Sequence, residues 1–338
     1  MKTLKEVKLA EYIKGRLRMV ATRYRFLVRL FLQINTNSRV ELIGLIFGRK
    51  LASIRLNEET KITISRKEIF SELWYLMDIT RIRTRLQGMK DSVGLHLVSC
   101  GNLKCLTFKY NGTDLNFQYF DNNDLLTSLM AINITYVETK WEIVNASNAI
   151  IFDVGANIGD SAVYFVLRGA KRVIAIEPFD SLFRLLIKNV KLQEMGGVIT
   201  CVNKSLEELV NGVERTKTTS PNYPFIGSRF VVSSDLDTNK IIDHNRFSGL
   251  LTEAEGDAND LILKISCAGC EEILLNVDKK LFRKFKQICI EYNYGYKSLV
   301  NKLVSSGFSV SYSRPHGSYA RSLDNPHVFL GIIVAKRV

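Results

Sequence analysis

Apolar runs and helical patterns alternate along the second half of the chain, as they do where parallel strands are covered by helices. Short runs rich in β-branched residues predict strands, and apolar residues at helical spacing predict helices. The predicted strands are 149–154, 172–176, 261–265 and 287–290, the predicted helices are 160–168 and 297–305, and a closing pair of strands is predicted at 309–312 and 328–335. Their order predicts an α/β fold whose sheet ends in an antiparallel hairpin.

The first half of the chain has a different pattern. Between 51 and 94, apolar and charged residues alternate at helical spacing, which predicts helices. Two segments, 103–110 and 113–120, flank Asn111-Gly112, a strong signal for a β-hairpin, and a helix is predicted from 121 to 134. These patterns divide the chain into a basic, mainly helical region (1–94), a hairpin and helix (95–147) and the α/β domain (148–338).

A glycine turn follows the first strand of the α/β domain. Gly155 and Gly159 allow a tight turn and leave room for a ligand near the backbone, while Asp153 and Glu177 end two successive strands. An acid about 20 residues beyond such a turn can accept hydrogen bonds from both ribose hydroxyls. Asn157 stands where the G-x-G-x-x-G motif of nicotinamide enzymes has a glycine, which favours S-adenosylmethionine (SAM). A dinucleotide and a turn without a ligand remain as alternatives.

The segment FDVGANIGDSAVYFVLRGAKRVIAIEP, residues 152–178, resembles the FkbM family of SAM-dependent methyltransferases, particularly its archaeal members. Segments 261–271 and 288–292 support the resemblance. It implies a Rossmann-like class I methyltransferase fold with a seven-stranded sheet, SAM as cofactor, and O-methylation of a sugar, a glycolipid or another small hydroxyl compound. The residues implied for cofactor binding are Asp153, Gly155, Asn157, Gly159 and Glu177, with Asn203 and Ser205 near the adenine, and Tyr136 and Glu138 are further candidates for contact with SAM or acceptor.

The chain departs from the family where a catalytic base is expected. The family usually has Lys-Ile-Asp-x-Glu-Gly-x-Glu, whereas this chain has Ser266 and Ala268 in place of the first two acids and keeps Glu271. A positioned base typically accelerates a reaction 10²- to 10⁴-fold, and neither replacement can act as one. The remaining candidates are Glu271 and Glu291, with two loop histidines, His316 and His327, favoured less. A non-catalytic SAM-binding protein is therefore an alternative to an enzyme.

The six cysteines include a C-x-x-C pair, Cys267 and Cys270. This spacing suits a redox pair or half a zinc site, but zinc needs two more ligands and Cys100 with Cys105 makes a poor second half. We expect no metal site. We expect Cys267 and Cys270 to be unpaired, small side chains at a strand-to-helix junction, because unpaired buried thiols fit a protein of a reducing compartment.

Charge is concentrated at the N-terminus. Residues 1–40 contain ten Lys or Arg and two Glu, which supply +8 of the formal net charge of +13. Apolar residues recur there at helical spacing, so the segment predicts a basic amphipathic helix. Such a helix either docks on its own protein, lies on an anionic membrane surface, or binds nucleic acid. No export signal or long apolar run is visible, which predicts a cytoplasmic protein, peripheral to a membrane if the helix lies on one.

The 338 residues are enough for two domains and a substantial core. Residues 212–259 are polar and too long for an ordinary connection, which predicts an insertion near the pocket. An RNA methyltransferase is a further alternative that suits the charge. Nucleic acid is disfavoured as a partner because the segment 264–271 lacks the Asn/Asp-Pro-Pro-aromatic sequence of amino-methylating enzymes.

Overall fold

The computed structural model describes residues 36–55, 61–65, 93–100, 103–119, 131–211, 260–267, 270–292, 296–312 and 331–338, with a few single positions between them. The predictions for residues 1–27, for most of 212–259 and for His316 and His327 lie outside these described residues. The chain divides into two compact units. The first comprises Met1–Asp114 and Tyr119–Asn133, and the second comprises Leu115–Gln118 and Ile134–Val338.

The first unit contains a small two-stranded sheet where helices were predicted. Helix α2 (Thr36–Ile46) precedes strands β1 (Leu51–Arg55) and β2 (Lys61–Ser65), which pair antiparallel. The prediction of helical structure is therefore wrong for these two segments. The sequence of β2, Lys-Ile-Thr-Ile-Ser, alternates polar and apolar residues strictly and is rich in β-branched side chains, which favours a strand.

A three-stranded sheet follows, formed by β3 (His96–Cys100), β4 (Leu103–Tyr110) and β5 (Thr113–Tyr119) in that order. Asn111 and Gly112 join β4 to β5, and both have positive φ angles of 48° and 83°. Positive φ at both central residues is the requirement of a type I′ turn, which matches the twist of a hairpin. The predicted hairpin is confirmed.

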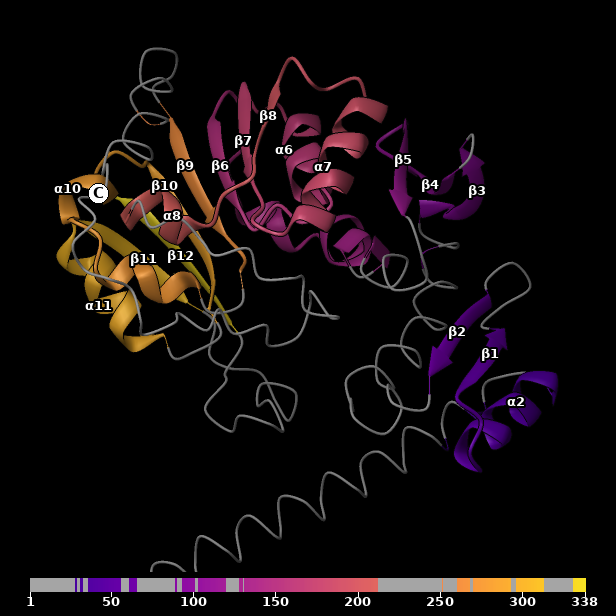
Figure 1. Cartoon of the computed structure of the whole chain (residues 1–338). Coiled ribbons are helices and arrows are strands. Elements are labelled where there is room, and N and C mark those ends of the chain that lie inside the picture. The colour runs from indigo at the N-terminus through magenta and orange to yellow at the C-terminus, as the bar shows by residue number, and fades with distance from the viewer. Residues whose placement is uncertain are drawn as a thin grey trace, which may run out of the picture. The chain divides into compact units, whose positions relative to one another are not determined.

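The second unit is built on a seven-stranded sheet (Figure 1) with the order β11-β12-β10-β9-β6-β7-β8. Its strands are β6 (Ile150–Val154), β7 (Arg172–Ile176), β8 (Ile199–Val202), β9 (Leu261–Ile265), β10 (Gln287–Tyr292), β11 (Phe308–Tyr312) and β12 (Gly331–Arg337). Strand β12 pairs antiparallel with both of its neighbours, whereas β6 to β10 pair parallel. The predicted α/β sheet with an antiparallel C-terminal hairpin is confirmed.

Helices cover both faces of this sheet. Figure 1 shows α6 (Asp160–Leu167) and α7 (Asp180–Leu192) beside β6, β7 and β8, and α11 (Lys297–Ser305) beside β11. Alternate residues of β6, namely Ile150, Phe152 and Val154, belong to a core cluster with side chains of α8 (Leu206–Asn211), the 3₁₀ helix η3 (Cys270–Leu275), α10 (Lys279–Phe282) and α11. The side chains between them, including Asp153, point to the opposite face, because strand residues alternate.

Two short helical turns precede β6. They are the π-helix η1 (Asn133–Val137) and the 3₁₀ helix η2 (Lys140–Ile143), which carries the buried Trp141. The π-helical segment directly follows the α-helical residues 131 and 132, and such segments within helices are often found at functional sites. Among the helices that the structure describes, none is long and apolar enough to cross a membrane.

Candidate functional site

The loop between β6 and α6 is the backbone cradle of the candidate site. Gly155 has a φ of +75° and Gly159 a φ of +93°, which side-chain-bearing residues rarely adopt. A Cβ at Gly155 would collide with the carbonyl oxygen of Ser266, and a Cβ at Gly159 would lie 2.9 Å from Cδ1 of Leu186. The predicted need for glycine at both positions therefore has a steric cause as well as a conformational one.

Glu177 lies at the end of β7, facing this loop. Its two carboxylate oxygens accept hydrogen bonds of 2.9 Å, one from the backbone N–H of Asn157 and one from that of Phe179. The side-chain amide of Asn203 donates to the Glu177 carbonyl oxygen at 3.0 Å. The structure thus brings together Glu177, Asn157 and Asn203, three of the residues predicted to hold a cofactor.

Asn157 carries an unsatisfied polar atom. Its Oδ1 is buried without a hydrogen-bond partner, one of two such side-chain atoms in the part of the chain that the structure describes. A buried acceptor that is left unpaired costs about 1–3 kcal/mol, so such groups normally find a partner. The loop therefore presents an acceptor oxygen and a carboxylate together, as the donors of a ribose or an amine require.

Both carboxylate oxygens of Asp153 interact with other side chains of the protein. Its Oδ1 lies 2.6 Å from the ammonium of Lys264, and its Oδ2 accepts a 2.6 Å hydrogen bond from the Ser161 hydroxyl. The same ammonium donates to the Gly155 carbonyl oxygen at 3.2 Å and lies 4.7 Å from the centre of the Trp141 ring. Through the hydrogen bond from Lys264 to Gly155, the ion pair of Asp153 and Lys264 holds the first residue of the glycine loop in place.

Asp160, the first residue of α6, is a buried acid beside this network. Thr135 Oγ1 donates to its Oδ2 at 2.6 Å, and the Tyr136 hydroxyl donates to its backbone carbonyl at 3.0 Å. Burial raises the pKa of Asp160 to about 6, against the lowering effects of the Thr135 hydrogen bond and the Lys264 charge. Tyr136, predicted as a ligand or packing residue, is buried and anchors α6, whereas Glu138 is exposed.

Asn189 of α7 holds the other end of the loop. Its side-chain amide donates to the Ile158 carbonyl oxygen at 2.9 Å, and its Oδ1 accepts from the Gln118 backbone at 2.7 Å. A fully buried asparagine with both ends of its amide paired is a rigid clamp. Sequence reasoning did not identify Asn189, since nothing in the helical pattern marks it.

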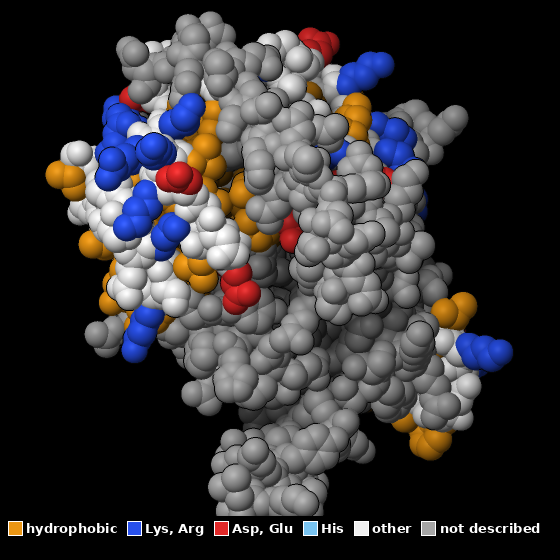
Figure 2. Space-filling view, turned by 60° about the vertical axis from the view of Figure 1, so that its left-hand side comes forward, with side chains coloured by type: hydrophobic (Ala, Val, Ile, Leu, Met, Phe, Trp, Pro, Cys, Tyr) orange, Lys and Arg blue, Asp and Glu red, His pale blue; other side chains and the backbone are white. Residues whose placement is uncertain are grey.

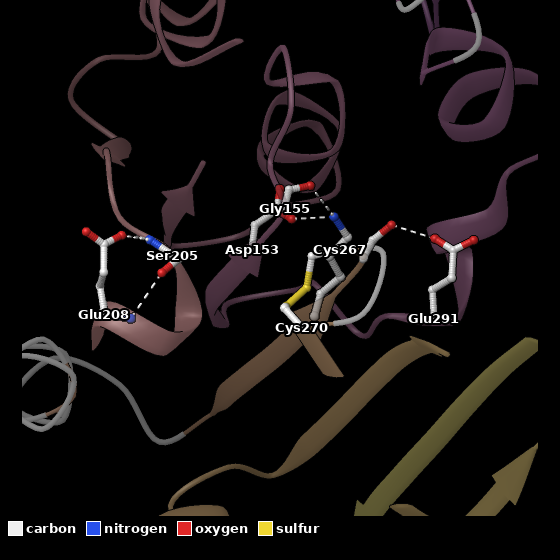
Figure 3. The surroundings of a disulfide bond; sticks show 9 residues. Asp153, Gly155, Ser205, Glu208, Cys267, Cys270 and Glu291 are labelled. Carbon is white, nitrogen blue, oxygen red and sulfur yellow. Dashed lines mark hydrogen bonds and ion pairs between the residues drawn. A yellow bond between two sulfur atoms is a disulfide. The ribbon is translucent and has the colours of Figure 1, made fainter. Parts of the chain in front are cut away.

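Ser266 and Glu291 form a polar pair at the ends of β9 and β10 (Figure 3). The Ser266 hydroxyl donates to Glu291 Oε2 at 2.5 Å, and the Lys140 ammonium pairs with Oε1. Burial alone would raise the pKa of the Glu291 carboxyl, but Lys140, the Ser266 hydrogen bond and Lys264 together hold this pKa below its ordinary value. Glu291 is therefore ionised and a weak base, with both oxygens engaged.

Ser205 caps the N-terminus of α8. Its hydroxyl accepts from the Glu208 N–H at 3.0 Å, while Glu208 Oε2 accepts from the Ser205 N–H at 2.6 Å, as Figure 3 shows. This reciprocal pair is a capping box, which satisfies two backbone donors at the start of a helix. The sequence Ser-Leu-Glu-Glu at 205–208 has the Ser-x-x-Glu spacing that is typical of a capping box.

Cys267 and Cys270 form a disulfide directly after β9. The prediction of two unpaired thiols is therefore wrong, because the Cα atoms of the two residues lie 5.5 Å apart, within reach of a disulfide. Glu271 follows in η3 and is completely buried, so it is not a solvated carboxylate. Among the described residues, no cluster of His, Cys, Asp and Glu could hold a metal ion.

No protein-family model matches the chain, and no curated protein sequence is significantly similar to it. Solved structures with a similar arrangement include a putative tRNA methyltransferase from Streptococcus pneumoniae (16% identity, 60% of this chain and 68% of that chain, TM-score 0.37). The TrmK protein of M. capricolum, in complex with S-adenosyl-homocysteine, has 16% identity over 56% of this chain and 63% of that chain, with a TM-score of 0.33. The M. jannaschii TYW2 protein, in complex with AdoMet, has 13% identity over 72% and 93%, with a TM-score of 0.34.

The strand order, the parallel centre and the antiparallel hairpin define the fold class. They are those of the Rossmann-like class I SAM-dependent methyltransferases. In open α/β sheets of this kind, ligands bind outside the carboxyl ends of the strands. Gly155, Glu177 and Ser266 all follow such strand ends in this chain.

Proposed function

We propose that this protein binds SAM in the loop between β6 and α6 and transfers its methyl group to a hydroxyl of a sugar, a glycolipid or another small molecule. The observation that carries the cofactor assignment is the buried, unpaired Oδ1 of Asn157 beside the carboxylate of Glu177. A ribose hydroxyl or an amine supplies the donor that this oxygen lacks. Gly155 and Gly159 leave the space that such a ligand needs.

The hydroxyl acceptor is proposed from the resemblance to the FkbM family. The bound cofactor would supply an electrophilic sulfonium methyl group. The contribution of the chain is to hold the two reactants in line, and well-oriented reactants gain about 7–11 kcal/mol over free ones. At the strand ends, the Ser266 oxygen and the Glu291 carboxylate, which share a hydrogen bond with each other, keep lone pairs that can accept a hydrogen bond from a hydroxyl. The same replacement of the family's acid by Ser266 supports the alternative of a protein that binds SAM without transferring its methyl group.

Calorimetric titration with SAM tests the cofactor assignment. Asn157→Gly removes the acceptor oxygen and tolerates the φ of +53° at this position. We expect it to weaken SAM binding by about 2- to 10-fold, the value of one hydrogen bond. Glu177→Ala should weaken binding more, since charge-assisted hydrogen bonds are about twice as strong. Glu194→Gly is the matched control, because Glu194 also has a positive φ of 58° but lies after α7. Equal SAM affinity in all four proteins would refute the assignment.

Methyl transfer from labelled SAM to sugars, glycolipids and RNA would then identify the acceptor. Transfer to a hydroxyl compound supports the proposal. Tight SAM binding without transfer to any acceptor supports the binding-only alternative instead.

One surface favours a nucleic acid as second candidate. Figure 2 shows Lys and Arg side chains gathered on the side of the molecule that carries α10 and α11. The exposed members at α10 and the end of β12 are Lys279, Lys280, Arg283, Lys286, Lys336 and Arg337. They lie at the amino end of β10, whereas the candidate site lies at the carboxyl ends of the strands. RNA bound to these residues would lie away from the candidate site. Methyl transfer to RNA therefore requires an RNA long enough to extend from this surface to the carboxyl ends of the strands.

We also propose that the basic segment 1–40 contacts an anionic membrane surface, on the strength of its sequence pattern. Deletion of this segment should abolish binding to vesicles that contain anionic lipids and leave SAM affinity unchanged. Vesicle binding that survives the deletion would refute the proposal.

A further inference from the structure

The two cysteine residues of the Cys267–Cys270 disulfide differ in exposure. Cys267 is partly exposed, whereas Cys270 is buried at the first residue of η3. Exchange begins with attack by a thiolate on an accessible sulfur, so this asymmetry directs the attack to Cys267. A backbone hydrogen bond of 3.1 Å from the Cys270 N–H to the Cys267 carbonyl also joins the two residues.

The disulfide closes a ring of only four residues. Disulfides stabilise a fold largely by constraining the unfolded chain, and the effect grows with the length of the closed loop. A ring this short constrains the unfolded chain little. Its main consequence is therefore local, on the segment that it closes.

The start of that segment, at Ser266 and Cys267, contacts the candidate cofactor site. Ser266, the residue before Cys267, donates its N–H to the Val154 carbonyl at 2.9 Å, and its own carbonyl oxygen fills the space beside Gly155. The Cβ of Cys267 would lie 3.4 Å from a Cβ at Gly155. In Figure 3 the disulfide lies below Gly155, and Glu291 lies to its right.

Two further cysteines of the described residues are free thiols and are not expected to take part in exchange. Cys201 and Cys289 are free thiols, and burial raises the pKa of Cys201 to about 11 and that of Cys289 to about 12. The thiolate is the reactive form, so both are inert at neutral pH. They provide internal controls for the reactivity of the pair.

We propose that Cys267 and Cys270 form a thiol–disulfide exchange site that takes a dithiol reductant of the thioredoxin type, and that reduction loosens the strand end that borders the glycine loop. The second part rests on the proposed function, because it concerns SAM binding.

The reaction balances as an exchange of two thiols for one disulfide. A thiolate of the reductant attacks Sγ of Cys267, the bond between the two cysteines breaks, and Cys270 leaves as a thiolate that takes up a proton. The second thiol of the reductant, as a thiolate, then attacks the reductant sulfur that is bonded to Cys267. Cys267 leaves as a thiolate, which also takes up a proton. The reductant ends as a disulfide, and the protein ends as a dithiol.

The exchange is tested on the full chain, equilibrated in graded ratios of reduced to oxidised dithiothreitol and then alkylated. Peptide mass spectrometry reports each cysteine separately. We expect Cys267 and Cys270 to become labelled together as the buffer becomes more reducing, with no change at Cys201 and Cys289. A pair that is fully alkylated in the most oxidising buffer, or never alkylated in the most reducing one, overturns the exchange site.

The coupling is tested by SAM affinity in the oxidised and the reduced protein. We expect reduction to weaken binding on the order of fivefold, the effect of freeing about one backbone residue. The double variant C267S/C270S should match the reduced protein in either buffer, and C201S should respond to reduction like the native chain. Equal affinity in both states overturns the coupling while the exchange site stands. Failure to bind SAM in either state refutes the proposed function and leaves the alkylation result unaffected.

Discussion

Asp153 and Lys264 are register partners in the adjacent parallel strands β6 and β9, and their side chains form an ion pair of 2.6 Å that is almost completely buried. Each strand is otherwise apolar, so the two charges compensate each other inside the sheet. The Lys264 ammonium also reaches the Gly155 carbonyl oxygen, which links the pair to the glycine loop. The ion pair therefore connects the centre of the sheet to the candidate site.

Removal of one partner of this pair should be costly. We expect Lys264→Met to lower the free energy of unfolding by about 3–5 kcal/mol, because it leaves an uncompensated buried carboxylate. The double variant Asp153→Asn with Lys264→Met should recover much of this loss. Urea denaturation of the four proteins of the cycle measures the coupling, and additive effects of the two substitutions would show that the pair does not act as a unit.

Gly155→Ala should perturb the loop more than its backbone angle alone requires. A left-handed φ costs a side-chain-bearing residue about 1–2 kcal/mol, and the new Cβ must also displace the Ser266 carbonyl. We expect a total loss of about 2–5 kcal/mol in unfolding free energy, together with weaker SAM binding. Gly307→Ala is the matched control, because Gly307 has a φ of +93° and open space around it. Similar losses in both variants would contradict the steric contact.

The central strands and the glycine turn could be predicted from the sequence because their signals are local. Mainly apolar runs such as that of β6 and the pair Gly155 and Gly159 determine a strand and a turn without reference to distant residues. The Asn111-Gly112 hairpin is local in the same way. Strands β1 and β2 were missed because each has only five residues within a longer segment whose spacing suits a helix. The pairing of the two strands decides between helix and strand.

The polar network of the site could not be predicted, since it depends on register. Lys264 lies 111 residues from Asp153, and the only local signal was a single lysine within an apolar strand. The disulfide could not be predicted either, because the C-x-x-C spacing alone does not determine that the two Cα atoms lie 5.5 Å apart. The role of Ser205 was available in principle, because the Ser-x-x-Glu spacing of a capping box is a sequence signal.

The stability of the protein should depend on the protonation of Asp160. Its folded-state pKa of about 6 lies above the ordinary value of 3.8 for an aspartate. Between these pH values the folded state holds a proton that the unfolded state has lost, so stability falls as pH rises from about 4 to 6, by about 2–3 kcal/mol. Asp160→Asn should abolish this part of the pH dependence. Parallel pH profiles for the two proteins, measured by urea denaturation, would contradict the raised pKa.

Ser205→Ala separates a capping role from a cofactor role. Loss of the hydroxyl at a helix N-cap should lower the free energy of unfolding by about 0.5–2 kcal/mol. If the hydroxyl serves only the capping box, SAM affinity should stay unchanged. Ser205→Thr keeps the capping oxygen and should restore stability. A loss of SAM affinity in the alanine variant alone would instead support the predicted position of Ser205 near the adenine.

Ser266→Asp restores the acid that the FkbM family has at this position, and the structure predicts that it will not restore catalysis. The Ser266 hydroxyl lies 2.5 Å from Glu291 Oε2, so the new carboxylate would face an existing one. Two carboxylates at this distance raise each other's pKa, and the Lys140 charge is already engaged with Glu291. We therefore expect weaker methyl transfer than in the native chain and a raised pKa for one of the two carboxyl groups. Ser266→Asn, which has the same shape without the charge, is the control. Transfer that rises 10²-fold or more in the aspartate variant would show that the missing acid was the catalytic base.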